Sequence, residues 1–452
     1  MLLISLIWLR KCKFCFLCLL LVIPSLYSAP LPQWAKAPKV NELASLTLKE
    51  SLSYAFGRSP SISQQAAQMG IGDAQIREAQ SAWYPQIGLS GNTGSSTQND
   101  IGNSLNNSAS YGISLTQLVY DFGKTTNNIR QQEATSESYR YKLMATMTEV
   151  AEQTAATYVQ VKRYEELVKA ARENIASLTS VRDMAKLRAD AGLSTRSDVL
   201  QAETRIASMR STQQDYQAQL QTAKSQLAVL TGVQAAHYQS LPDSLAQQPV
   251  ALDHIDYSQI PTVLMAESQQ QAASYAVDKA KSQHWPTISL QGNRTRYENN
   301  NNDYWNNQLQ LNVQAPVYQG GAVSSRIAQA EGARKMSTSA IDQSKLDVLQ
   351  KASVAFANWN GARGREEASQ QQYLSARNTR DVYKNEYKLS TRSLNDLLSV
   401  EQEVFQAEYS RIAANFDGWV AAINYASAVN NLMPLAGIAL GDQQRLPELN
   451  SN

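Results

Sequence analysis

The chain has 452 residues, and its 41 lysines and arginines against 39 aspartates and glutamates give a formal net charge of +2. A balance this close to neutral offers no electrostatic basis for binding nucleic acid, so that class of partner is excluded. After residue 28 no stretch approaches the roughly 20 consecutive apolar residues that a membrane-spanning helix requires. Any role in a membrane must therefore use another architecture.

The N-terminal segment has the layout of a secretory signal peptide, which we place at residues 1–28. Three basic residues precede an apolar run over Phe14–Ile23, and small residues follow at Ser28 and Ala29. An uncleaved anchor remains an alternative, because the residues before the basic group are apolar as well. Removal of the segment takes three positive charges from the formal +2 and leaves −1.

The three cysteines of the chain, Cys12, Cys15 and Cys18, all lie in this segment. The mature chain then has no thiol, so we expect neither a disulfide nor a cysteine metal site. The bulky pair Phe16–Leu17 before Cys18 does not fit a lipoprotein cleavage box.

The second half of the chain repeats the first at a spacing of about 200 residues. Two prolines recur 201 positions later, Pro60 and Pro85 as Pro261 and Pro286. Two longer motifs recur 198 positions later, Val119–Gly123 as Val317–Gly321 and Ser197–Leu200 as Asn395–Leu398. A repeat of this length predicts two fused copies of one module, which we place at residues 48–232 and 261–432.

Each copy begins with a helix and continues into a hairpin of two strands, at about 85–119 and 286–317. Apolar and polar residues alternate there with period two. Polar loops, Ser95–Asn107 and Glu298–Asn307, are expected to join the strands. Aromatic residues stand at the strand ends: Trp83, Tyr84, Tyr120, Phe122, Trp285 and Tyr318.

One-sided apolar strands with aromatic ends are typical of the lipid-facing band and girdle of an outer-membrane barrel, although a soluble sandwich sheet fits the same local pattern. Four strands cannot close a barrel, because membrane barrels begin at eight. A spanning structure must therefore pool strands from several chains, and three chains supply twelve.

Long helices follow each hairpin. A helix over about 123–188 would contain roughly 65 residues and reach about 100 Å. Gly192 is placed to end it, and Thr195–Asp198 has the form of a helix start, so the chain turns near 192 and returns to Gly232. In the second copy, the turn is expected near 390. A heptad seam of small and partly polar residues runs along these helices and includes Val161, Ala171, Ala202 and Leu227, which favours oligomerisation.

The order of helix, strand, strand, long helix, tip turn and return helix, all present twice, resembles the TolC-type outer-membrane export channels, also called outer-membrane efflux proteins. The resemblance covers about residues 46–432. It implies a mixed α and β membrane protein: a homotrimer with a 12-stranded barrel in outer-membrane lipid, continuous with a 12-helix periplasmic tunnel. Residues 29–47, 233–260 and 433–452 are then expected in an equatorial belt at mid-height.

The resemblance also implies roles for residues at the tips of the helices. A periplasmic gate latch falls on Asp198, Ser197, Tyr387 and Arg392, an acidic ring at the tunnel entrance on Asp396, and the adaptor contact on Gly192, Leu193 and Ser194. Two departures stand out. Ser399 occupies the place of a second acidic ring. Ser390 replaces the turn glycine of the second copy, so that turn is expected to be less left-handed.

These tip residues also have plainer interpretations. Asp198 and Asp396 fall at the third helical position, where helix capping alone favours a carboxylate. The segment Gly192–Ser194 also reads as an ordinary turn.

The function implied by the resemblance is that of the exit duct of a tripartite export machine, with a periplasmic adaptor and an inner-membrane transporter, expected to be an ABC ATPase. The cargo expected is a type I secreted protein, and small-molecule efflux is the alternative. An enzyme is not supported, because His237, His254 and His284 lack a metal-binding or catalytic spacing, so no cofactor or metal is expected. A third class is a purely structural coiled-coil protein or the periplasmic adaptor itself, but an adaptor usually has one helical hairpin, whereas this chain has two helical hairpins and two strand pairs.

Overall fold

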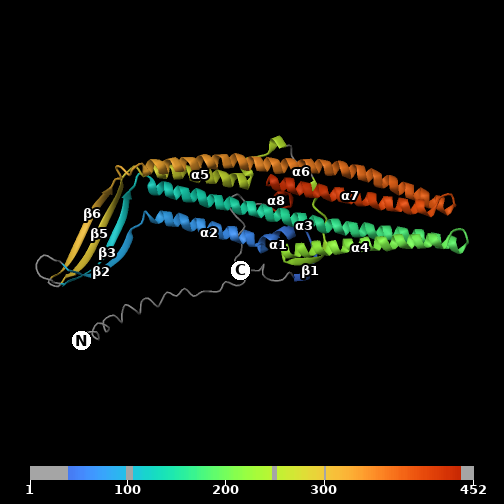
Figure 1. Cartoon of the computed structure of the whole chain (residues 1–452), viewed down its shortest axis with the longest axis horizontal. Helices are drawn as coiled ribbons and strands as arrows, with labels where there is room; N and C mark the ends of the chain where they lie inside the picture. The colour runs from blue at the N-terminus through green and yellow to red at the C-terminus, as the bar shows by residue number, and fades with distance from the viewer. Residues whose placement is uncertain (1–38, 98–104, 247–251, 300–301, 439–452) are drawn as a thin grey trace, which may run out of the picture. The chain divides into compact units, whose positions relative to one another are not determined.

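The computed structural model describes residues 39–97, 105–246, 252–299 and 302–438, so the predicted signal peptide lies outside the described residues. The described residues all belong to one compact unit. Its helices and strands follow the chain in this order (Figure 1): β1 Lys39–Leu46, α1 Leu48–Arg58, α2 Pro60–Ser81, β2 Gln86–Thr97, β3 Leu105–Tyr120, α3 Lys124–Asp190, α4 Arg196–Thr231, β4 Val233–Tyr238, the short 3₁₀ helices η4 Asp243–Ala246, η5 Leu252–His254 and η6 Tyr257–Gln259, α5 Pro261–Ser282, β5 Thr287–Asn299, β6 Asn302–Gln314, α6 Ala322–Lys388, α7 Leu394–Ala428 and α8 Leu432–Leu435.

The duplication is visible in the lengths of the helices. Both α2 and α5 have 22 residues, both α3 and α6 have 67, and α4 and α7 have 36 and 35. Pro60 and Pro261 occupy the first positions of α2 and α5, where the missing N–H of proline costs no helical hydrogen bond. In each copy one long helix runs past two shorter ones, since α2 and α4 contact α3 while α5 and α7 contact α6.

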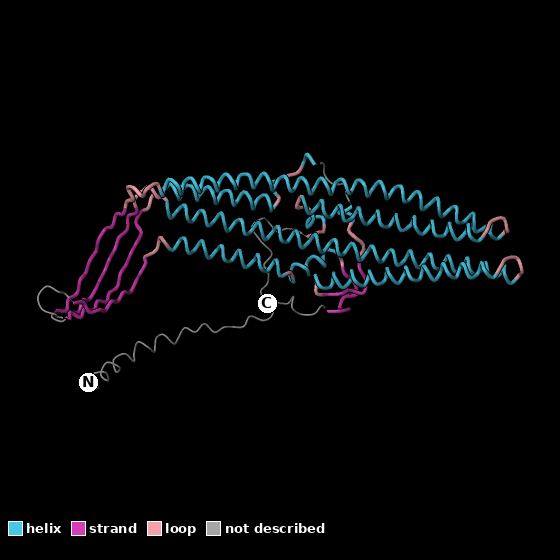
Figure 2. The backbone as a smooth tube through the Cα atoms, viewed as in Figure 1, coloured by secondary structure: helices cyan, strands magenta, loops and turns pink. Residues whose placement is uncertain are grey.

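The four long strands form one antiparallel sheet in the order β2-β3-β5-β6, so the hairpins of the two copies join through β3 and β5. Figure 2 shows the sheet at one end of the helices and both tip turns at the opposite end.

The strands continue further than the predicted polar loops allowed. Ser95–Thr97 pairs with Leu105–Asn107, and Glu298–Asn299 pairs with Asn302–Asp303, so the loops expected at Ser95–Asn107 and Glu298–Asn307 were placed too widely. Residues 98–104 and 300–301 lie outside the described residues. Polar side chains misled the prediction because the backbone ladder of a hairpin does not require apolar residues.

The main hydrophobic core lies midway along the helices, beside a second sheet in which β1 and β4 pair in parallel. Leu46, Leu227 and Leu432 are buried there, and Tyr158 of α3 donates from its hydroxyl to the backbone oxygens of Leu46 (2.9 Å) and Gln239 (2.8 Å). The segments before, between and after the two copies thus meet at one level of the helical bundle.

The long helices bury a seam of small and apolar side chains, and α6 exposes most of its other residues, whereas most residues of α3 are buried or half-buried. Val161, Ala171, Ala202 and Leu227 of the predicted heptad seam are buried. No helix among the described residues has the length and hydropathy needed to cross a membrane.

Candidate functional site: the helix tips and the exposed sheet face

The two tip turns share one backbone geometry. The helix α3 ends at Asp190 and Gly192 follows with φ +72°, while α6 ends at Lys388 and Ser390 follows with φ +65°. The expectation of a less left-handed second turn is therefore wrong. In both turns a backbone N–H reaches back five residues, Leu193 to Arg188 (2.8 Å) and Thr391 to Glu386 (3.0 Å), which closes a Schellman motif.

Both return helices begin at the predicted residue, but only α7 has the predicted side-chain cap, because Thr195 makes no side-chain cap hydrogen bond. Ser393 Oγ accepts from the backbone N of Asp396 at 3.2 Å, and the backbone oxygen of Thr195 accepts from the N of Asp198 at 3.1 Å. Asp198 and Asp396 occupy the third helical positions of α4 and α7 and are half-buried. A role in capping is thus compatible with the geometry at both positions.

Tyr387 lies in the cluster that joins the two helical hairpins at their tips. It is 2 % exposed and packs among buried side chains from the other three helices there: Leu178, Val181, Ala185, Ala202, Ile206, Leu394, Leu397 and Leu398. Burial raises the pKa of Tyr387, and the Asp198 carboxylate raises it further. The Arg188 guanidinium and the Ser194 hydroxyl oppose this rise.

Arg392 is held within its own hairpin. Its Nε donates to Glu386 Oε2 at 3.0 Å, and its guanidinium lies 4.1 Å from the ring centroid of Tyr383. The hydrogen bond to Glu386 raises the pKa of Arg392. Within the described part of the chain no ion pair joins Arg392 to Asp198, so the structure of one chain does not bring these two predicted partners together.

The remaining predicted tip residues lie at the surface. Ser197 and Gly192 are exposed, and Leu193 is 67 % exposed. Ser194 donates from Oγ to the backbone oxygen of Ala185 at 3.3 Å, which fixes the turn. In the second turn Leu389, the counterpart of Ala191, is 75 % exposed, so an apolar side chain is exposed at each tip.

The role of one residue at the helix tips was not predicted from the sequence. Arg188, in the last turn of α3, donates from Nη1 to the backbone oxygen of Tyr387 at 2.6 Å and from Nη2 to Ser390 Oγ at 2.9 Å. A basic residue in the last turn of a helix is an ordinary signal for stabilising that same helix end, and nothing local indicated a contact with α6.

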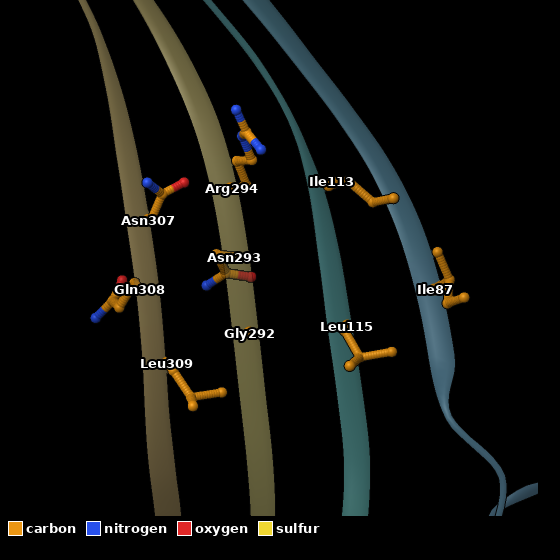
Figure 3. A pocket seen from close by; sticks show the side chains of 9 residues that line it. All are labelled: Ile87, Ile113, Leu115, Gly292, Asn293, Arg294, Asn307, Gln308 and Leu309. Carbon is orange, nitrogen blue, oxygen red and sulfur yellow. The ribbon is translucent and has the colours of Figure 1, made fainter.

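The sheet has one apolar face and one polar face. On the apolar face, Leu89, Ile113, Leu115 and Leu309 are exposed, whereas their neighbours along each strand are polar. Figure 3 shows several of these side chains around a shallow concave region that also includes Arg294 and Asn307. An exposed apolar face of this size requires a covering in the native environment.

Aromatic rings mark the end of the sheet next to the helices. Phe122 stacks on Trp285 with centroids 5.4 Å apart and contacts Tyr120 at 4.7 Å. The other predicted girdle residues, Trp83, Tyr84 and Tyr318, lie in the same connections between strands and helices, but no ring contact joins them to this group among the described residues.

A second aromatic group, which was not predicted, lies in the β-hairpins toward the end of the sheet that is far from the helices. Tyr111 contacts Trp305 at 6.5 Å between centroids, and the guanidinium of Arg294 lies 4.7 Å from the Trp305 ring. Tyr111, Arg296 and Trp305 are directly opposite one another on three strands, on the apolar face. The group was missed because Trp305 fell inside the loop expected at Glu298–Asn307.

The described residues carry no group of three histidines, cysteines or acids that could hold a metal ion. The three histidines are exposed, and His254 is bonded to the neighbouring Asp253 at 2.7 Å.

The family model for outer membrane efflux proteins matches residues 52–233 and 258–430, one segment for each copy of the repeat. The outer membrane efflux protein BepC of Brucella suis biovar 1 (strain 1330) is 24% identical over 398 residues, which cover 85% of this chain and 86% of BepC. The outer membrane protein TolC of Escherichia coli (strain K12) is 23% identical over 412 residues, 86% of this chain and 83% of TolC.

A solved structure of CusC, studied for its folding and transmembrane channel formation, covers 84% of this chain and 91% of its own. The TM-score is 0.76 at 18% identity, so the two share a fold. Since the family model covers both repeats and most of the chain, the chain belongs to the outer membrane efflux protein family, the TolC-type outer-membrane channels.

Proposed function

We propose that three copies of this chain form a channel whose 12-stranded barrel spans the outer membrane and continues into a 12-helix periplasmic tunnel. The observation that carries the proposal is the sheet, which has open edges at β2 and β6 and one exposed apolar face. Long open edges are a liability that closure into a barrel removes, and lipid covers the apolar face.

The helices support the same assembly. Each chain has two long helices, and two shorter helices lie along each of them: α2 and α4 along α3, and α5 and α7 along α6. Each pair of shorter helices counts as one further row, so one chain has four helical rows and three chains have twelve. Apolar residues on α6, among them Met336 and Leu346, are exposed in one chain, and packing against a neighbouring copy would cover them. Residues 29–47, 233–260 and 433–452 would contribute to the equatorial belt around the tunnel.

The tips of the helices would form the periplasmic gate. Because Arg392 is bonded to Glu386 within one chain, we place its latch between copies, with Arg392 of one copy facing Ser197 and Asp198 of the next, whereas Tyr387 is buried and would act within its own chain. An exposed bond between a guanidinium and a carboxylate is directional yet weak enough to release. Asp396 would line the entrance as a ring of three carboxylates, and Gly192–Ser194 would contact the adaptor.

The channel would be the exit duct of a tripartite machine, joined through a periplasmic adaptor to an inner-membrane transporter of the ABC ATPase class. We propose a type I secreted protein as cargo, because Cys18 lacks an acylation box and the Tyr120–Gly123 boundary resembles that of secretion members. Small-molecule efflux is the second candidate, favoured by the efflux description that the matching family carries.

A comparison of cells with and without the gene tests the cargo. Loss of one or a few large proteins from the culture supernatant, with unchanged drug susceptibility, would support protein secretion. An unchanged supernatant with heightened susceptibility would instead assign the chain to efflux.

Purified protein in a planar lipid bilayer tests the gate. We expect heat-sensitive trimers with a small single-channel conductance that rises when the latch is removed by Arg392→Ser and Tyr387→Phe. An unchanged conductance in the double variant would refute the latch assignment, and monomers in the outer-membrane fraction would refute the channel.

A further inference from the structure

The Arg188 side chain connects the two helical hairpins of one chain at their tips. It leaves the last turn of α3 and reaches the end of α6, where its Nη1 donates to the backbone oxygens of Tyr387 (2.6 Å) and Lys388 (3.4 Å). Its Nη2 donates to Ser390 Oγ (2.9 Å), and the guanidinium carbon lies 4.8 Å from the Tyr387 ring centroid. One side chain thus makes four contacts with the other hairpin.

The end of α6 is chemically suited to this partner. The last carbonyls of a helix lack helical donors and carry the negative end of the helix dipole. A guanidinium is planar and holds several donors in fixed positions, so it can bind a carbonyl and a hydroxyl at once, which an ammonium cannot do in the same geometry. Arg188 therefore caps a helix that belongs to the other copy of the repeat.

Ser390 completes the arrangement at a conformational cost. Its φ of +65° is the left-handed region that glycine adopts in the first turn, at Gly192. A residue other than glycine is strained there, because its Cβ approaches the backbone too closely. Serine supplies the hydroxyl that Arg188 binds, and glycine has no side chain with which to do so.

The two copies have diverged at these positions. The counterpart of Arg188, 198 positions later, is Glu386, which has the opposite charge and holds Arg392 within its own hairpin. The first tip therefore reaches across to the second, whereas the acid of the second tip orients the guanidinium that we assign to the latch.

We propose that Arg188 is a positioning residue of the gate, a clasp that fixes the second hairpin tip and the Tyr387 ring against the first tip of the same chain. The inference rests on the proposed channel function and adds to it a lock within each copy, separate from the latch between copies. Loss of the clasp leaves the second tip free to move away from the first and favours the open state.

Single-channel recording of Arg188→Met tests the clasp. We expect the open-to-closed ratio to rise by about tenfold, the factor that corresponds to losing a hydrogen bond to a charged group. Arg188→Lys keeps the charge but not the fork, and Ser390→Gly keeps the turn but not the hydroxyl, so each should give a smaller rise. Arg196→Ala removes the same charge from an exposed position on the same tip and should leave the ratio unchanged.

A second readout measures the position of the tips directly. The three cysteines of the chain all lie in the predicted signal segment, so spin labels at Leu193→Cys and Leu389→Cys, diluted with unlabelled chains, report the distance between the two exposed tips. We expect Arg188→Met to broaden this distance distribution and Arg196→Ala to preserve it, with heat-sensitive trimers present in both.

The outcomes separate the clasp from the gate. If Arg392→Ser with Tyr387→Phe raises conductance while Arg188→Met, Arg188→Lys and Ser390→Gly all behave as wild type, the clasp is refuted and the latch stands. If none of these variants changes conductance, the gate and the clasp both fail. Should Arg188→Met not assemble, wild-type behaviour in Arg188→Lys and Ser390→Gly still overturns the clasp.

Discussion

At the scale of single residues, two buried tyrosines differ in what their hydroxyls do. Tyr158 and Tyr238 are both fully buried, with ring centroids 5.9 Å apart. The Tyr158 hydroxyl bonds two backbone oxygens, which tie β1 and the segment after β4 to α3. The Tyr238 hydroxyl has no hydrogen-bond partner among the described residues. Removal of the hydroxyl should therefore change the free energy of unfolding by different amounts at the two positions.

We expect Tyr158→Phe to lower the free energy of unfolding by about 1–3 kcal/mol, because two buried carbonyl oxygens lose their donor. Tyr238→Phe should be neutral or stabilising, since it removes a buried hydroxyl that gains nothing from the protein. Denaturant titration of the purified variants in detergent measures both. Equal losses of free energy of unfolding in the two variants would contradict the different roles assigned to the two hydroxyls.

A buried acid lies a short way along α7 from the gate. Glu401 is fully buried against α3, where Ser177 Oγ donates to its Oε1 at 2.6 Å. Burial raises the pKa of Glu401 above its usual value, while Ser177, Arg380 and Lys384 oppose the rise and Asp381 adds to it. The folded protein thus binds this proton more tightly than the unfolded chain does.

Stability should consequently fall as pH rises from the unfolded pKa of about 4.3 through the raised folded value. Glu401→Gln should flatten that decline, and Ser177→Ala should steepen it because the carboxylate loses a donor. Thermal melts of helical circular dichroism from pH 4 to 8 check this. Glu403→Gln, an exposed position on the same helix, is the control. A wild-type pH slope in Glu401→Gln would refute the role of this carboxyl.

At the scale of elements, the junction between the two repeats depends on a close approach of β3 and β5. A Cβ at Gly112 would lie 2.7 Å from the backbone oxygen of Arg294 and 2.9 Å from the Cα of Thr295. Only glycine allows these two strands to approach so closely without a shift of the backbone.

Gly112→Ala should weaken the pairing of the two hairpins by about 1–3 kcal/mol, the usual range for overpacking. We expect a reduced yield of heat-sensitive trimers on unboiled gels. A Cβ at Gly94 would meet no described atom within 4 Å, so Gly94→Ala should assemble as wild type. Normal assembly of Gly112→Ala would show that the strands can separate without cost.

At the scale of the whole molecule, the two faces of the sheet should meet different surroundings. Leu89 is 88 % exposed on the apolar face, and the adjacent Ser90 is exposed on the polar face. If lipid covers the apolar face and water fills the lumen, the two neighbouring positions should respond in opposite ways to a charge.

Leu89→Arg should reduce insertion strongly, because a lipid-facing arginine near the bilayer midplane costs about 2–4 kcal/mol. Ser90→Arg should be tolerated, since a lumen-facing charge stays in water. The amount of trimer in the outer-membrane fraction measures both. Equal tolerance at both positions would refute the proposed orientation of the sheet.

The sequence alone determined the features that depend on near neighbours. The duplication, the prolines that open α2 and α5, the glycine that ends α3 and the cap of α7 are all short-range signals, so they can be recognised without knowledge of the packing. The alternating strands were recognised for the same reason, although polar residues near the hairpin tips concealed the last pairs of the ladder.

Only the tertiary structure decided which distant residues meet. Arg188 and Tyr387 are 199 positions apart, and the helical pattern around Arg188 does not specify which helix end its guanidinium reaches. The left-handed conformation of Ser390 and the contact of Tyr111 with Trp305 were likewise not specified by the local sequence. Each depends on how two separately predictable hairpins pack together, and that packing balances burial, hydrogen bonds and strain across the whole chain, so no local pattern contains it.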